Sequence, residues 1–194
     1  MGRVGGSRQT ARGVRVMAHP TGDGQDSRGS RERHEPRAPH RAGAWSLLGL
    51  LAVCYAVAGL GAWASADAGS VYGSLVRPGW APPGWLFGPV WTVLYASIAV
   101  AAWLVLRRPA GSTRTAMTWW SVQLALNLAW TPLFFAAGQY GLAFLDICLL
   151  LTALALTLTS FTRHRKSAAL MLLPYAAWVA FAAALNLSIW LSNT

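Results

Sequence analysis

The chain carries little charge, and long stretches carry none. Of its 194 residues only 11% are charged, against about 25% in an average soluble domain. The uncharged stretches run from Arg41 to Asp67, from Arg77 to Arg107, and from Lys166 to the end. A helix at the surface of a soluble protein shows a charged face. Because these stretches have no such face, the sequence excludes an ordinary soluble helical protein and predicts an integral membrane protein.

Residue types used by catalytic and metal sites are also scarce. The two cysteines, Cys54 and Cys148, lie inside apolar stretches without ligand spacing, so we expect buried thiols rather than a disulfide framework or a metal site. All four histidines lie outside these stretches, which leaves no nucleophile–base pair for hydrolysis. A glycine loop of the phosphate-binding type is missing as well. We therefore expect no metal and no cofactor.

Five windows are long and apolar enough to cross a membrane, which takes about 20 mostly apolar residues. They lie at about 44–64, 85–106, 116–137, 142–162 and 167–191. The predicted fold class is therefore all-α, an integral membrane bundle of five transmembrane helices. The first window ends in Ala64-Ser65-Ala66, a sequence similar to a signal-peptidase site. Its apolar run is longer than the roughly 7–15 residues of a signal peptide, so we predict a retained helix.

The basic surplus is concentrated at the start of the chain. The formal net charge is +10, and nine of the sixteen basic residues precede residue 42. Residues 1–43 have almost no large apolar side chains, so we predict a disordered tail ahead of a membrane domain at 44–194. A solvated tail is favoured over one held at anionic lipid. A start at Met17 in place of Met1 would shorten the tail.

Basic residues in the loops predict the orientation, because Lys and Arg mark the cytoplasmic side of a membrane protein. They gather in the tail and in the loops 107–114 and 163–166, whereas the first loop has Arg77 alone and the end of the chain has none. This alternation predicts an N-terminus inside and a C-terminus outside. The surplus lies in a tail and short loops rather than on a folded basic face, so nucleic acid is not an expected partner.

Residues 77–95 combine four prolines, three tryptophans and three glycines. Proline withholds a backbone N–H, so the part before Phe87 can form neither a regular helix nor a sheet strand. The segment is also too aromatic for an ordinary solvated loop. We predict a rigid, aromatic-lined connection over the mouth of the helix bundle, with Pro89 in the first turn of the next helix.

Aromatic and amide side chains recur along one face of three predicted spans. Offsets of three and four residues place side chains on the same side of a helix. The stripes contain Trp91 and Tyr95 in the second span, Trp120, Gln123, Asn127, Trp130 and Phe134 in the third, and Tyr175, Trp178, Ala182 and Asn186 in the fifth. Each amide by itself favours a hydrogen bond between helices. Together with the aromatic connection, the stripes favour a pocket for a flat, largely apolar ligand.

Asp146 is the one acidic residue inside a predicted span. A carboxylate there costs roughly 3 kcal/mol on insertion scales, so it normally faces a cavity or a partner. It also lies near the start of its span, where it would favour the positive end of a helix at the membrane interface. Both interpretations stay open.

Four segments resemble a known family. They read RPGWAPP at 77–83, FGPVWTVLY at 87–95, QLALNLAW at 123–130 and PYAAWVAFA at 174–182. In this order and spacing they are similar to the TspO/MBR family of tryptophan-rich sensory proteins and translocator proteins. The resemblance covers about residues 44–194 and leaves the tail out.

The resemblance implies a five-helix bundle in a bacterial-type cytoplasmic membrane, with the lipid bilayer and a second copy of the chain in a homodimer as partners. It also implies binding of porphyrins such as protoporphyrin IX and of other flat hydrophobic ligands. The ligand-binding residues that it implies are Tyr72, Trp80, Trp91, Asn127, Trp130, Asp146, Trp178, Ala182 and Asn186.

The function implied is that of a receptor or sensor that regulates tetrapyrrole levels or a stress response. Two alternatives follow from the same resemblance. One is a porphyrin-degrading enzyme that uses Trp91 and Trp178, and the other is a translocator of tetrapyrroles or sterol-like ligands. The receptor is favoured because the sequence shows neither an acid–base pair nor the internal repeats of alternating-access transporters.

Overall fold

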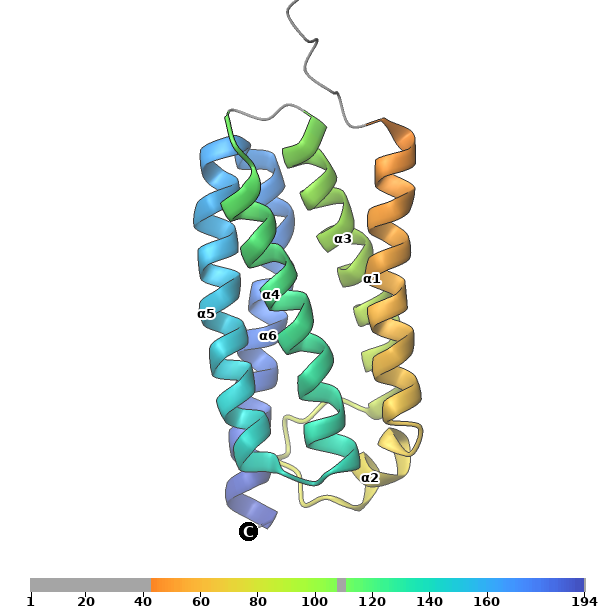
Figure 1. Ribbon diagram of the computed structural model, residues 1–194. Coiled ribbons are helices and arrows are strands. Elements are labelled where there is room, and N and C mark those ends of the chain that lie inside the picture. The colour runs from red at the N-terminus through yellow and green to blue at the C-terminus, as the bar shows by residue number, and fades with distance from the viewer. Residues whose placement is uncertain (1–42, 108–110, 194) are drawn as a thin grey trace, which may run out of the picture. The chain divides into compact units, whose positions relative to one another are not determined.

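The computed structural model describes residues 43–107 and 111–193, which belong to one unit of the chain, residues 39–194. Within these ranges every regular element is a helix, which confirms the all-α class for the described part of the chain (Figure 1). The elements are α1 (Ala44–Ala64), α2 (Ala68–Ser74), a 3-10 turn (Gly84–Leu86), α3 (Phe87–Arg107), α4 (Arg114–Thr131), a π-helical turn (Pro132–Ala136), α5 (Tyr140–His164) and α6 (Lys166–Asn193). The tail predicted at 1–43 lies outside the described residues apart from Gly43.

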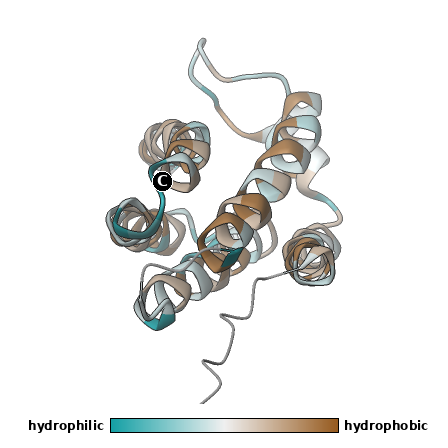
Figure 2. Cartoon of the chain, turned by 90° about the horizontal axis from the view of Figure 1, so that it is seen from above, coloured by the Kyte–Doolittle hydropathy of each residue, from teal (hydrophilic) through white to brown (hydrophobic). Residues whose placement is uncertain are grey.

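The five long helices of the described chain form a closed ring. Around the ring, α1 contacts α3, α3 contacts α6, and α6 contacts α5. Helix α5 then contacts α4, and α4 contacts α1. The short α2 and the connection after it lie at the end of the bundle where α6 finishes, as Figure 1 shows. From above, several helices are seen end-on, and brown and pale shades predominate over teal along them (Figure 2). The ring therefore places α3 between α1 and α6, although α6 is last in the sequence.

Four helices of the described chain are long and apolar enough to cross a membrane, namely α1, the helix Gly84–Arg107, α5 and α6. They coincide with four of the five predicted spans. The remaining predicted span, 116–137, is also helical, as α4 and the π-helical turn, but it is not among these candidates. The reason is its polar content, because α4 carries Gln123 and Asn127 together with several hydroxyl groups. Hydropathy therefore supports four membrane spans rather than the five predicted.

Proline and glycine determine where helices begin and end. Pro89 is the third residue of α3, where its missing N–H removes no helical hydrogen bond, as predicted. Pro132 follows the last residue of α4 and begins the π-helical turn. Gly138 then adopts a left-handed backbone with φ of +61°, which glycine tolerates best, and the chain turns into α5. The segment before Phe87 contains only bends, turns and the short 3-10 turn, which also agrees with the proline content.

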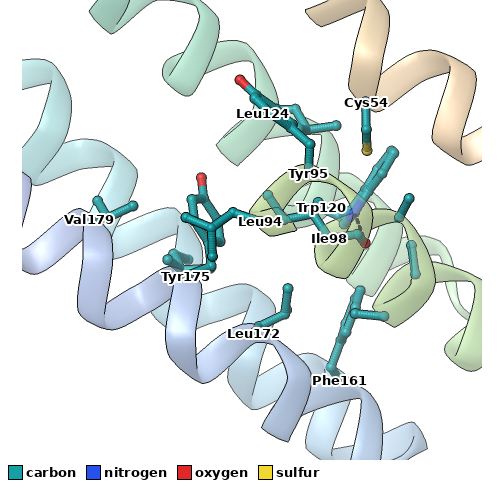
Figure 3. Packing of buried hydrophobic residues seen from close by; sticks show 14 of the residues in the cluster. Cys54, Leu94, Tyr95, Ile98, Trp120, Leu124, Phe161, Leu172, Tyr175 and Val179 are labelled. Carbon is teal, nitrogen blue, oxygen red and sulfur yellow. Dashed lines mark hydrogen bonds between the residues drawn. The ribbon is translucent and has the colours of Figure 1, made fainter. Parts of the chain in front are cut away.

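The main apolar core lies among the long helices. Cys54 of α1, Trp120 of α4 and Phe161 of α5 belong to one buried cluster with side chains of α3 and α6 (Figure 3). Trp120 also donates its indole N–H to the carbonyl of Ile98 at 3.2 Å, which ties α4 to α3. Cys54 is fully buried and Cys148 half-buried, and both are free thiols, as expected for apolar cysteines.

Helix α1 is the candidate span that the bundle covers least. Only 11% of its most apolar window is buried, against 39% in each of the other three. Trp45 and Trp63, near its two ends, are 85% and 80% exposed. An apolar helix left uncovered on most sides needs an apolar surrounding, and tryptophan near both ends is typical of the two membrane interfaces. These features identify an integral membrane protein.

A chain of buried side-chain hydrogen bonds joins α3, α4 and α6. The Tyr95 hydroxyl donates to Asn127 Oδ1 at 2.6 Å, and Asn127 Nδ2 donates to the Tyr175 hydroxyl at 3.1 Å. Tyr175 in turn donates to Gln123 Oε1 at 2.8 Å. All four side chains are at most 6% exposed. The expectation that the amides bond between helices is therefore confirmed for both residues, and the bonds lie where no water could replace them.

We expect Tyr175→Phe to lower the free energy of unfolding by about 1–3 kcal/mol, because it removes the partner of two buried amides. The matched control is Tyr55→Phe. Tyr55 also bonds through its hydroxyl, to the carbonyl of Thr92 at 3.1 Å, but it is 41% exposed. The measurement is the midpoint temperature of thermal unfolding in a non-ionic detergent. Equal shifts of the midpoint temperature for the two variants would contradict the expectation that the buried hydrogen bonds stabilise the bundle.

Candidate functional site

A cavity of about 540 Å³ lies at the end of the bundle where α2 is found. Its walls come from α1, α2, α3, α4 and α6 and from the turns beside them, whereas α5 contributes none of the lining residues. Those residues are Ala58, Gly61, Ala62, Ser65, Ala66, Ala68, Gly69, Tyr72, Gly84, Phe87, Gly88, Trp91, Thr92, Tyr95, Asn127, Trp130, Thr131, Phe135, Trp178 and Ala182. The cavity thus lies inside the ring of helices, beyond the end of the buried core.

Three tryptophans from three different helices form its aromatic walls. Each ring is held in place by another aromatic ring, Trp91 by Tyr95, Trp130 by Phe134 and Trp178 by Phe87, at centroid distances of 5.5, 5.0 and 5.9 Å. Aromatic pairs of this kind are favourable beyond the area they bury. The tryptophan rings therefore present fixed surfaces on which a flat ligand can stack.

The α1 wall is smooth because its lining residues are small. Ala58, Gly61 and Ala62 face the cavity, and Ser65 follows just beyond the end of the helix. Offsets of three and four place these residues on one side. Large side chains therefore line the cavity on one side, and a nearly flat helix face lines it on the other.

A few polar groups line the cavity, and two of them are buried without a hydrogen-bond partner among the described residues. These are the Ser65 hydroxyl and the indole N–H of Trp178. Both atoms are covered by neighbouring atoms, so they are unused hydrogen-bonding groups within the wall rather than groups exposed to the open cavity. Asn127 and Tyr95 also reach the cavity, but their orientation is fixed by the hydrogen-bond chain that continues through Tyr175 to Gln123. In the described residues no group of three His, Cys, Asp or Glu side chains could hold a metal ion.

The structure brings six of the nine expected ligand-binding residues to the cavity wall. They are Tyr72, Trp91, Asn127, Trp130, Trp178 and Ala182. They come from α2, α3, α4 and α6, so the stripes on different helices do converge. The binding role of all nine residues stays a prediction.

The other three expected residues lie elsewhere. Asn186 supports the wall from behind, because its Oδ1 accepts the indole N–H of Trp130 at 3.1 Å while its Nδ2 donates to the carbonyl of Tyr140 at 3.0 Å. Trp80 is 52% exposed and packs edge-on against Phe181 at 5.6 Å. Asp146 is buried on α5, and its Oδ2 has no hydrogen-bond partner in the described chain. It is not among the lining residues.

Several lining residues were missed by the sequence analysis. Ser65 was considered only as part of a sequence similar to a signal-peptidase site. The small residues of α1 carry a usable signal, since Ala58, Ala62 and Ser65 recur at offsets of four and three. Helical periodicity does not point to Phe135, which lies in the irregular π-helical turn and packs edge-on against Trp130 at 5.9 Å.

The connection of residues 75–83 covers this end of the bundle and is tied down at two points. The buried Tyr72 hydroxyl donates to the carbonyl of Pro82 at 2.9 Å. The Asn193 amide, in the last turn of α6, bonds both the N–H and the carbonyl of Val76, at 3.0 and 2.9 Å. Two anchors on different helices therefore hold the connection, which we call the cover.

Comparisons with known proteins agree with this architecture. Residues 50–191 match the TspO/MBR family. The translocator protein of Homo sapiens is 40% identical over 125 residues, which cover 63% of this chain and 74% of that protein. The tryptophan-rich protein TspO of Chlorobaculum tepidum is 39% identical over 120 residues, covering 61% and 76%. The tryptophan-rich sensory protein of Cereibacter sphaeroides is 33% identical over 143 residues, covering 73% and 88%.

The family match extends over more than half of the chain and includes every helix that lines the cavity. It also includes the proline- and tryptophan-rich segment and the two amide-bearing segments on which the resemblance rested. The chain belongs to the TspO/MBR family.

Proposed function

We propose that the chain is a membrane receptor and sensor that binds porphyrins of the protoporphyrin IX type, and other flat hydrophobic ligands, in this cavity. The observation that carries the proposal is the cavity itself, with its three tryptophan walls and its volume of about 540 Å³. Pockets for small molecules typically measure about 300–1,000 Å³ and are mostly apolar with a few placed polar groups. Relatives of the chain are named sensory and translocator proteins.

The chain would recognise its ligand by a combination of stacking and hydrogen bonding. The rings of Trp91, Trp130 and Trp178 suit the faces of a conjugated macrocycle. The Ser65 hydroxyl and the Trp178 N–H have no partner in the described chain and are covered in it. They would bond polar atoms of the ligand once small side-chain movements expose them to the cavity. Because the cavity is bounded by α1, α3, α4 and α6, a ligand that fills it touches four helices at once. A sensor needs such contacts, since a ligand shifts a conformational equilibrium only through unequal affinity for the two states.

A receptor is favoured over an enzyme by the chemistry of the lining. No lining residue is a histidine, lysine, arginine or carboxylic acid, and the hydroxyls of the lining tyrosines Tyr72 and Tyr95 donate to Pro82 and Asn127. The lining therefore lacks the groups that acid–base catalysis uses most often. Trp91 and Trp178 do line the cavity, and redox or light-driven porphyrin breakdown through these rings is the alternative. An irradiation experiment distinguishes the two.

We expect Ala182→Phe to weaken protoporphyrin IX binding at least tenfold, because the added ring fills space that the ligand would occupy. Ala182 is 8% exposed and lines the cavity. The matched control is Ala184→Phe, on the same helix but exposed at the surface of the bundle. Affinity is measured by quenching of tryptophan fluorescence in detergent. Unchanged affinity for Ala182→Phe, with the control also unchanged, would place the porphyrin outside this cavity.

In light, the absorption spectrum of bound porphyrin should decay no faster than that of porphyrin in protein-free detergent. This follows if the chain binds without transforming its ligand. Samples kept in darkness and samples of Trp91→Phe and Trp178→Phe serve as controls. If a bilin-like product forms with the original chain and is absent with both variants, the chain is a porphyrin-degrading enzyme and the receptor proposal is wrong.

The same proposal includes five membrane spans, with α4 and its π-helical turn as the third. Two observations support α4 as a span. It lies between α1 and α5 in the ring, and its amides Gln123 and Asn127 are bonded inside the bundle, so they need not face lipid. With an odd number of spans, the two ends of the chain lie on opposite sides of the membrane. The distribution of basic residues favours an N-terminus in the cytoplasm.

A reporter enzyme that works only outside the cytoplasm should therefore be active when it is fused after Thr194. The same reporter fused after Gly111 should be inactive, because two spans, α1 and α3, separate that loop from the cytoplasmic N-terminus. A chain with four spans, in which α4 does not cross, would give both fusions the same activity. Activity after Gly111 alone would reverse the orientation.

A further inference from the structure

The basic residues of the described chain are distributed unequally between the two ends of the bundle. Arg107, Arg114 and the group at 163–166 all lie at the end away from α2 (Figure 1). Arg77, on the cover, is the one basic residue at the cavity end within the described residues. It forms no ion pair there with either described acid, Asp67 or Asp146. An arginine fixed near an apolar cavity without a carboxylate partner needs a separate explanation.

The guanidinium of Arg77 is positioned by Tyr72. Its Cζ lies 4.6 Å from the centroid of the Tyr72 ring, while that ring is 4% exposed and lines the cavity. The Tyr72 hydroxyl is bonded to the Pro82 carbonyl, so the ring beneath the cation cannot turn freely. Arg77 itself is exposed. The Tyr72 ring therefore lies between the guanidinium of Arg77 and the cavity.

Open space surrounds this charge. A hollow of about 400 Å³ in the cover is lined by Arg77 and by residues that include Pro78, Pro82 and Pro83. The prolines offer no backbone N–H to an anion, and the N–H of Ala81 is already bonded to the carbonyl of Pro78. The guanidinium of Arg77 is the charged donor of the hollow. The Tyr72 ring stands between the cavity and this hollow, since it lines the first and bonds to the wall of the second.

We propose that Arg77 binds a carboxylate at the edge of the ligand whose ring system occupies the cavity. The inference rests on the proposed function and assigns the residue that recognises the acidic edge of such a macrocycle. The planar guanidinium matches the two oxygens of a carboxylate and bonds them more strongly than it bonds an aromatic face. The apolar rings of the ligand then stack against the tryptophans of the cavity, and its carboxylate stays at the solvent-exposed end of the site.

The test compares protoporphyrin IX with its dimethyl ester, which keeps the macrocycle and removes both charges. Dissociation constants are measured in a non-ionic detergent, which supplies no lipid phosphate. Arg77→Gln is expected to weaken binding of the free acid about three- to tenfold and to leave binding of the ester unchanged. Arg77→Lys, which keeps the charge but loses the planar fork, should fall between the two.

Arg107→Gln is the matched control. The Arg107 guanidinium also lies over an aromatic ring, that of Trp103 at 4.5 Å, but at the opposite end of the bundle. This substitution should change neither affinity. The preference of the original chain for the free acid should also decrease with added salt, because exposed charges are screened.

The outcomes separate this inference from the proposed function. If Arg77→Gln weakens the acid and the ester equally, Arg77 supports the cover through Tyr72 and binds no carboxylate. If it changes neither affinity, the carboxylate lies elsewhere, and the inference is again overturned while porphyrin binding stands. If the original chain binds neither compound, the proposed function itself is wrong.

Discussion

The hydroxyl of Tyr175 is the point on which the arrangement of three helices depends. It accepts from Asn127 and donates to Gln123, and Asn127 in turn accepts from Tyr95. In the membrane interior no water replaces a lost partner, so α3, α4 and α6 must keep the positions in which these groups meet. Tyr95 and Asn127 also line the cavity. The hydrogen bonds that hold α3, α4 and α6 together therefore also fix two residues of the cavity wall.

The same constraint explains why two helices of similar length have opposite compositions. Helix α4 carries the amides, and for that reason it falls short of the hydropathy that the other candidate spans reach. Its amides bond inward, so a polar helix can still belong in a membrane. Helix α1 has no such groups to satisfy and is apolar on all sides. It contributes small residues, Ala58, Gly61 and Ala62, as one wall of the cavity, while large side chains such as Trp45 and Trp63 stay exposed at the surface of the bundle.

Sequence periodicity predicted the elements and their buried faces, but not which side chains would meet. The offsets of three and four placed Trp178, Ala182 and Asn186 on one stripe, and that stripe does face inward. Periodicity does not say how far along the stripe the cavity extends, and Asn186 lies beyond it, bonded to Trp130. Ser65 continues the spacing of the small residues Ala58 and Ala62, but it follows the end of α1, and small residues alone do not show that a helix face borders a cavity.

The cover illustrates why a proline-rich segment suits the mouth of such a site. Proline keeps its carbonyl while it lacks an N–H, so Pro82 can accept the Tyr72 hydroxyl without exposing an unpaired donor above an apolar cavity. Asn193 satisfies both backbone groups of Val76 on the other side. Tyr72 is at once a wall of the cavity, an anchor of the cover and the platform for Arg77. A ligand that displaces this ring therefore acts on the wall, the cover and the charge together, and such a linkage would let a bound molecule at the mouth alter the outer surface of the protein.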